Sequence, residues 1–196
     1  MSQEISQTAS RDPVAVALDR LASLLVHERD EGGLPPGDRA ELRRMDPLDA
    51  TLPPALWRLL TLPEVETAIS IVAGGEREKA ERAFGVVVQA IAEAGVSGNM
   101  RIGKALAETD YAEARFVRLL RARGRGNDFG DVAFEARQAA RWCALNGAAL
   151  RLGDFSRFVL EAALGRNDAD RRAHAIARDY FAAAMADAQS TTSTET

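Results

Sequence analysis

The feature that most constrains the fold is a helical spacing of apolar residues that continues through most of the chain. The first such segment begins at Pro13, because proline is favoured at the first helical position, and Asp12 before it is a favourable N-cap residue. That segment places four apolar residues on one helical face: Val14, Leu18, Leu21 and Leu25. The only strand-like run, three valines at residues 86–88, lies inside a helical pattern with no adjacent turn. The spacing therefore predicts an all-α protein, a compact bundle of about eight to nine helices.

Composition shifts at both ends of the chain set the expected domain limits. Residues 1–11 and 188–196 lack apolar periodicity, which is typical of disordered termini. Between them we expect a helical domain over residues 12–187. It would comprise an N-terminal bundle over about 12–123 and a C-terminal bundle over about 124–187, forming either one body or two small lobes.

Polar residues at the chain breaks predict where several helices begin. Asp38 and Asp110 each lie three residues before a glutamate, which is the spacing of a capping box. Asn127 or Asp128 is expected to cap the helix that follows it. Residues 95–99, with the sequence GVSGN, are expected to form a loop.

The overall composition indicates a soluble cytoplasmic protein. A hydrophobic content of 46% is enough for a proper core without a disulfide or a structural metal. The single cysteine, Cys143, excludes an internal disulfide and suits a reducing compartment. The first residues lack the features of a signal peptide, and no apolar run approaches the roughly 18 residues needed to cross a bilayer. We therefore expect no membrane association.

Basic residues are concentrated in one part of an acidic chain. The formal net charge is -4, although residues 101–125 alone carry +4, so the remainder carries -8. Of the 25 basic residues only Lys79 and Lys104 are lysine. Arginine favours planar, bidentate contacts with phosphate groups. The distribution suggests a local basic face that acts within a larger assembly.

The strongest single signal is the segment RFVRLLRARGR at residues 115–125. At 100° per residue, Arg115, Arg118 and Arg121 share one face, and the apolar residues occupy the other. No carboxylate is interleaved with the arginines. A solvated surface helix is the simplest interpretation, but such helices usually mix signs because like charges repel at these spacings. A stripe of one sign is favoured when a polyanion lies against it.

Four blocks of the sequence resemble the CasB family, the small subunit of the type I-E CRISPR Cascade complex. The most specific is MRIGKALAETDYAEARFVRLLRARG at residues 100–124, which is similar to the family's Ile-x-Leu-Gly-Arg-Ala-Leu pattern followed by an Arg-rich helix. Lys104 stands where the family usually has arginine. The other blocks follow in the family's order: GDRAELRRMDP (37–47), ALWRLL (55–60), and LRLGDFSRFVLEAAL with DRRAHAIARDYF (150–164 and 170–181).

The resemblance implies a helical subunit of a CRISPR antiviral defence complex with no catalytic site and no cofactor. Its implied partners are other Cascade subunits, a second copy of itself, the guide RNA and the target DNA, whose R-loop and displaced strand it stabilises. It implies neither a membrane partner nor a small-molecule substrate. The nucleic-acid-binding residues expected by position, together with the stripe, are Arg43, Arg44, Arg101, Lys104, Arg115, Arg118 and Arg121.

The C-terminal block departs more from the family, because Phe155 stands where the family has tryptophan. Its candidates are accordingly weaker: Arg141, Arg151 and Arg157.

Two other interpretations remain open at this stage. One is a helical protein–protein adaptor whose basic stripe meets an acidic partner. The other is a P-loop enzyme, because residues 98–105 match a Walker A motif except at the last position. There, Ala105 removes the hydroxyl that would hold Mg²⁺. Helix and loop are also expected before this segment, where a P-loop requires a strand. Cys143 and the isolated His27 and His174 fit structural roles better than catalytic or metal-binding ones.

Overall fold

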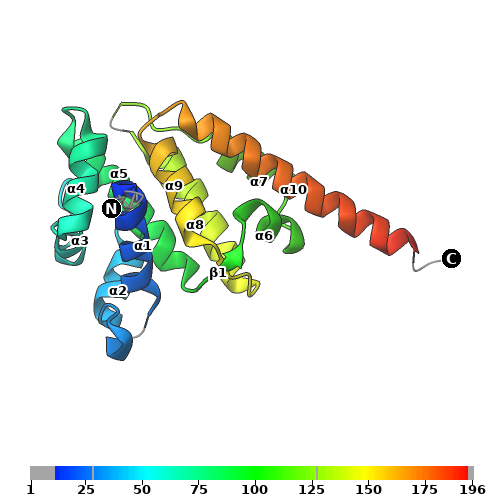
Figure 1. The fold of residues 1–196 in the computed structure, drawn as a ribbon, viewed down its shortest axis with the longest axis horizontal. Coiled ribbons are helices and arrows are strands. Elements are labelled where there is room, and N and C mark those ends of the chain that lie inside the picture. Colours follow the sequence, from blue (N-terminus) through cyan, green and yellow to red (C-terminus); the bar gives the residue numbers. More distant parts are fainter. Residues whose placement is uncertain (1–11, 28, 127, 194–196) are drawn as a thin grey trace, which may run out of the picture.

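The computed structural model describes residues 12–27, 29–126 and 128–193, and the regular structure in this part of the chain is almost all helix (Figure 1). The elements, in order, are α1 (Pro13–Val26), the 3-10 helix η1 (Arg29–Glu31), α2 (Pro36–Arg44), α3 (Pro54–Leu60), α4 (Pro63–Ala73), α5 (Arg77–Ala94), β1 (Ser97–Met100), α6 (Ile102–Glu108), α7 (Glu113–Arg121), α8 (Gly130–Leu145), α9 (Leu152–Ala163) and α10 (Asp168–Ser193). The predicted all-α fold is confirmed.

Helix α5 lies at the centre of the fold. Its residues 83–92 are all buried, including the three valines at 86–88, so the prediction of buried helix for that run is confirmed. α5 packs against α1, α2, α3 and α4, and also against α8 and α9. Since these partners come from both sides of residue 124, α5 connects the two expected bundles. The boundary between them stays a prediction.

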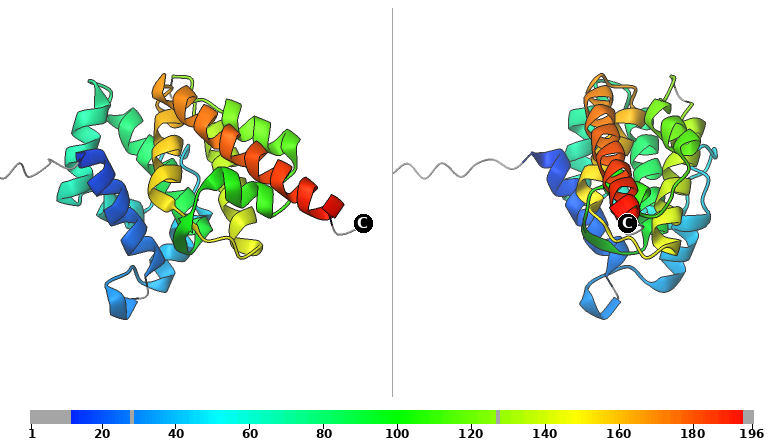
Figure 2. Two further views of the ribbon diagram at one scale, coloured as in Figure 1. Left: turned by 45° about the vertical axis from the view of Figure 1, so that its right-hand side comes forward. Right: turned by 90° about the vertical axis from the view of Figure 1, so that its right-hand side faces the viewer.

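Helix α10 begins near the C-terminal end of α9 and projects from the body at its own C-terminal end (Figure 2). It packs against α6, α7 and α9. The helix continues to Ser193, so the disorder expected from residue 188 is wrong as far as residue 193. Residues 182–188 are mostly alanine, the best helix former, which gives helical propensity without an apolar stripe. Residues 1–11 and 194–196 lie outside the described residues.

The short strand β1 was expected to be part of a loop. It runs beside the segment that joins α8 to α9, where the Met100 N–H donates to the Ala149 carbonyl at 3.3 Å. The Arg151 N–H in turn donates to the Met100 carbonyl at 2.7 Å. A Cβ on Gly98 would lie 2.6 Å from Ala149, so the glycine permits this close pairing.

Helix starts were predicted only in part. The Asp12 carboxylate accepts from the Val14 N–H at 3.0 Å, as expected for the N-cap of α1. The Asp128 carboxylate accepts from the N–H of Gly130, the first residue of α8, at 2.9 Å, but Asp128 lies one residue before the N-cap position, which Phe129 occupies. Asn127 lies outside the described residues. The two capping boxes are wrong: α2 begins at Pro36, ahead of Asp38, and Asp110 has a φ of 55° outside α7.

Gly103 sets how closely α6 approaches α10. A Cβ at this position would lie 2.2 Å from the Ile176 carbonyl oxygen and 3.0 Å from the Tyr180 nitrogen. Both atoms belong to the backbone of α10 and cannot move aside without shifting the helix. The glycine of the IGKAL motif is therefore needed for helix packing.

Gly103→Ala is expected to lower the free energy of unfolding by about 1–3 kcal/mol or more, because the added methyl group overlaps the α10 backbone. The measurement is urea unfolding followed by circular dichroism. Gly37→Ala is the matched control, since nothing lies within 4 Å of its added Cβ and its φ is not positive. Because alanine favours helix, the control should be neutral or stabilising by up to about 1 kcal/mol. Equal destabilisation of both variants would contradict this packing role.

Candidate nucleic-acid interface

Helix α7 has the two faces that its sequence predicts. Arg115, Arg118 and Arg121 are exposed, whereas Phe116 and Leu119 are buried. The Phe116 ring stacks on the Tyr180 ring of α10 with centroids 3.9 Å apart. This apolar contact fixes the rotation of α7 and directs its arginines to solvent.

Arg118 differs from its two neighbours because it has an acidic partner. Its Nε donates to Glu135 Oε1 of α8 at 3.0 Å, and the Glu135 residue is only 7% exposed. The expectation that the stripe has no balancing acid is therefore wrong at Arg118. The acid comes from another helix, so the spacing within residues 115–125 could not reveal it.

Arg115 and Arg121 make no hydrogen bond or ion pair within the described part of the chain. Both guanidinium groups are exposed, and Arg121 lines a groove of about 600 Å³ between α7 and α10. Exposed arginines without a carboxylate partner keep all their donors available for an anion. These two residues are the strongest of the predicted candidates on α6 and α7.

Arg101 and Lys104 lie at the start of α6 and face acids of their own. Arg101 Nη1 lies 3.4 Å from Asp179 Oδ2, and Lys104 Nζ lies 3.3 Å from Glu108 Oε1. All four side chains are more than one-fifth exposed, so these are surface ion pairs that a polyanion could replace at low cost.

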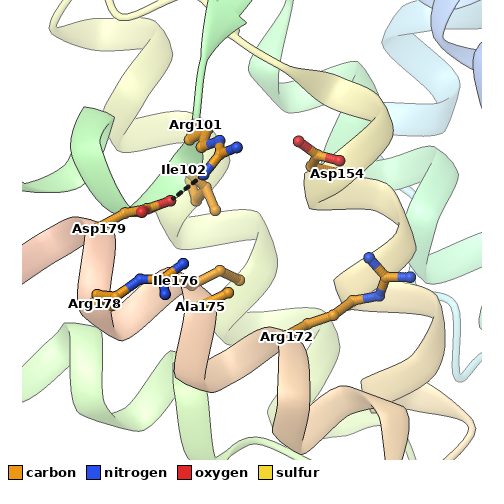
Figure 3. A pocket seen from close by; sticks show the side chains of 8 residues that line it. All are labelled: Arg101, Ile102, Asp154, Arg172, Ala175, Ile176, Arg178 and Asp179. Atoms are coloured by element: carbon orange, nitrogen blue, oxygen red, sulfur yellow. Dashed lines mark hydrogen bonds and ion pairs between the residues drawn. The ribbon is translucent and has the colours of Figure 1, made fainter.

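Arg101 also lines the cavity of about 310 Å³ shown in Figure 3. Arg172 and Arg178 contribute two further guanidinium groups to its wall, and Asp154 and Asp179 contribute two carboxylates. Figure 3 shows Arg101 directed toward Asp179. Of the three arginines of this cavity, Arg101 pairs with a carboxylate of the wall, whereas Arg172 pairs with Glu161, which does not line the cavity.

Arg43 and Arg44 lie on α2, away from the other candidates. Arg43 Nε donates to the Ala92 carbonyl in the last turn of α5 at 2.7 Å, so this side chain stabilises the helix end. Arg44 is exposed. α2 and α7 lie at opposite sides of the molecule in Figure 1, so the seven predicted residues do not form one patch.

The weaker C-terminal candidates divide in the same way. Arg141 is exposed on α8, and Arg151 lies 3.5 Å from Asp154. Arg157 instead has an internal role, because its guanidinium binds both Asp12 at 2.8 Å and Glu161 at 2.7 Å.

Glu161 is a residue that sequence analysis missed. It is 3% exposed, and its two carboxylate oxygens accept from Arg157 Nε at 2.7 Å and Arg172 Nε at 2.6 Å. Through these contacts it joins α9 to α10, and Arg157 extends the connection to Asp12 at the start of α1. A lone glutamate within an apolar helical run, as in FVLEAAL, is the sequence signal that could have indicated a buried ion pair.

The arrangement of residues 98–105 disagrees with a phosphate-binding loop. Gly98 lies in β1 against Ala149, and Gly103 lies inside α6 against α10, so neither glycine leaves room for a phosphate. Within residues 12–27, 29–126 and 128–193, no group of three or more His, Cys, Asp or Glu side chains is placed to hold a metal ion.

Cys143 is fully buried in α8, and burial raises the pKa of its thiol to about 12. Desolvation disfavours the thiolate, which is the form that acts as a nucleophile. The thiol therefore stays protonated at neutral pH.

No protein-family model, curated protein or solved structure matches this chain. The resemblance to the CasB family thus depends on the sequence blocks alone. None of the described helices combines the length and apolar character needed to cross a membrane.

Arg118→Glu is expected to lower the free energy of unfolding by about 1–3 kcal/mol, because it places a like charge against the buried Glu135 carboxylate. Arg115→Glu and Arg121→Glu, on the same exposed face, should change it by less than about 0.5 kcal/mol. Thermal and urea unfolding of the three variants measure the difference. Equal stability of all three would show that the Arg118–Glu135 pair has little effect.

Cys143 is expected to resist a thiol-reactive disulfide reagent at pH 8 in the folded protein and to react fully in urea. A raised pKa keeps the thiol neutral at every pH below about 12, and burial blocks access. The absorbance of the released thiolate follows the reaction. Rapid labelling of the folded protein would contradict the buried placement.

Proposed function

We propose that the chain is the non-catalytic, nucleic-acid-binding small subunit of a type I-E CRISPR Cascade complex in the cytoplasm. In this role it stabilises the R-loop of guide RNA and target DNA, together with the displaced strand. The other Cascade subunits and a second copy of the chain would be its protein partners. The observation that carries the proposal is that α7 exposes Arg115 and Arg121 without an acidic partner in the described chain.

Physical chemistry supports such a role for a small cationic face. In a guided complex, base pairing between the RNA and the target selects the sequence, so the protein needs contacts only to the nucleic-acid backbone. Arginines that neutralise phosphates release counterions, and this supplies affinity without sequence preference. Arg101 and Lys104 lie beside a different side of α10 from the α7 groove, and they would bind a polyanion only if it displaced Asp179 and Glu108.

A second candidate function, a protein–protein adaptor, is favoured by the outer face of α8. Phe134 and Leu145 are 57% and 74% exposed, and Arg141 lies between them on the same side of the helix. Exposed apolar side chains near a basic residue suit an amphipathic partner with acidic groups. In this case the protein would bind no nucleic acid even at low salt.

Arg115→Glu and Arg121→Glu are each expected to weaken binding of labelled single-stranded DNA about five- to tenfold at 50 mM salt, because each removes a phosphate contact and adds a repulsion. Fluorescence anisotropy measures the affinity. For the wild type, affinity should fall steeply between about 50 and 200 mM salt, and each variant should have a smaller salt slope.

Arg20→Glu is the matched control for these variants. Arg20 is exposed on α1 and makes no ion pair with any described residue, so its reversal changes the net charge by the same amount at a distant site. Its affinity should equal that of the wild type. If all three variants lost affinity equally, the effect would come from overall charge and α7 would not be the site. Absence of wild-type binding at 50 mM salt would favour the adaptor.

A further inference from the structure

The groove between α7 and α10 is lined by both charged and apolar side chains. Arg121, Arg123, Asp170 and His174 line its polar part, and Leu120 and Ala177 form part of its apolar wall. The two helices run antiparallel here, because Phe116 contacts Tyr180 while Arg123, further along the chain, pairs with Asp170 at 2.6 Å. Positions later in α7 therefore face positions earlier in α10.

Beyond the residues that line the groove, the same side of α10 carries an exposed aromatic ring, that of Phe181. Leu120 is one helical turn after Phe116, and Ala177 is one turn before Phe181. The Phe116 and Phe181 rings are in contact, with centroids 6.1 Å apart. Phe181 thus lies at the end of the groove opposite Arg123.

Phe181 has the properties of a fixed stacking surface. It is 42% exposed, although most phenylalanines of this chain are buried. Its ring makes edge contacts with Phe116 at 81° and with Tyr180 at 87°, so its orientation is set by the core. A ring that is already ordered loses little entropy when a base stacks on it, and stacking of this kind does not depend on sequence.

The two ends of the groove differ in charge. Arg121 has no partner among the described residues, whereas Arg123 is engaged by Asp170. At the other end, burial first, and then the charges of Glu113 and Asp110, raise the pKa of Tyr180. Carboxylates near Tyr180 disfavour a phosphate beside Phe181 and leave that end to an uncharged base.

We propose that this groove binds a single-stranded nucleic acid, with a phosphate at Arg121 and a base stacked on Phe181. The spacing between the phosphate position and the base position suits a short stretch of strand. His174 lies across the groove from Arg121 and seven residues before Phe181, which is roughly 10 Å along the helix or about three stacked nucleotides. A duplex keeps its bases stacked within the helix and cannot offer one to the ring. The inference rests on the proposed function, because it takes nucleic acid as the ligand, and adds a strand preference and a stacking residue.

The test compares Phe181→Leu with Phe134→Leu on an oligothymidylate and on an abasic oligomer of the same length. Phe134 is the matched control, because it is also an exposed phenylalanine but lies on α8. F181L should bind oligothymidylate at least fivefold more weakly than the wild type, and F134L should bind it equally well. F181W keeps an aromatic ring and should bind oligothymidylate as tightly as the wild type. This result would show that F181L binds weakly because it lacks the ring and not because it is misfolded. On the abasic oligomer all these proteins should bind alike.

Three outcomes would overturn the inference. If F181L bound oligothymidylate as tightly as the wild type while R115E still bound it more weakly, the stacking site would be wrong and the proposed function would stand. If F181L lost the same affinity on the abasic oligomer, Phe181 would act through packing and not through a base. If the wild type bound no nucleic acid at 50 mM salt, the inference and the proposed function would fail together.

Discussion

The burial of α5 on all sides is the constraint on which the rest of the structure depends. Ten consecutive residues of this helix, 83–92, have no exposed face, so each must match a neighbouring helix. Small residues make this possible: a Cβ on Gly85 would lie only 3.3 Å from Leu56 of α3. The buried Gln89 amide donates to the Met45 carbonyl and so ties the end of α2 to the same helix. α5 thereby fixes the position of α8, which packs on it, and α8 in turn helps to fix the position of α7.

Two buried carboxylates remove three arginines from the set available at the surface. Glu161 engages Arg157 and Arg172, and Glu135 engages Arg118. A carboxylate inside a protein must have such partners, because an unpaired buried charge costs several kcal/mol. The +4 charge of residues 101–125 therefore overstates the basic field of that surface. Its offsetting acids, such as Glu135, lie elsewhere in the chain.

Sequence periodicity was enough to predict most helices and the orientation of α7, because both depend on local spacing. It could not show that Arg118 meets Glu135, because that contact depends on how α7 packs on α8. The loop sequence GVSGN gave no sign that Gly98 pairs with Ala149, a contact that the α8–α9 connection creates. Asp110 has capping-box spacing, yet its left-handed backbone places it in the turn before α7. Helical spacing and capping-box spacing thus gave wrong predictions where elements distant in the sequence come into contact.

The presence on α7 of only two arginines that are unpaired in the described chain, Arg115 and Arg121, also limits how the proposed function would operate. A protein that neutralises only a few phosphates gains little free energy from counterion release, and its affinity for free nucleic acid is correspondingly weak. Inside a complex, the other subunits would hold the strand next to the groove, so that binding becomes effectively intramolecular. An acidic body is then an advantage, because it limits binding to unrelated nucleic acid outside the complex. Net charge of -4 and a basic α7 are thus compatible within one small subunit.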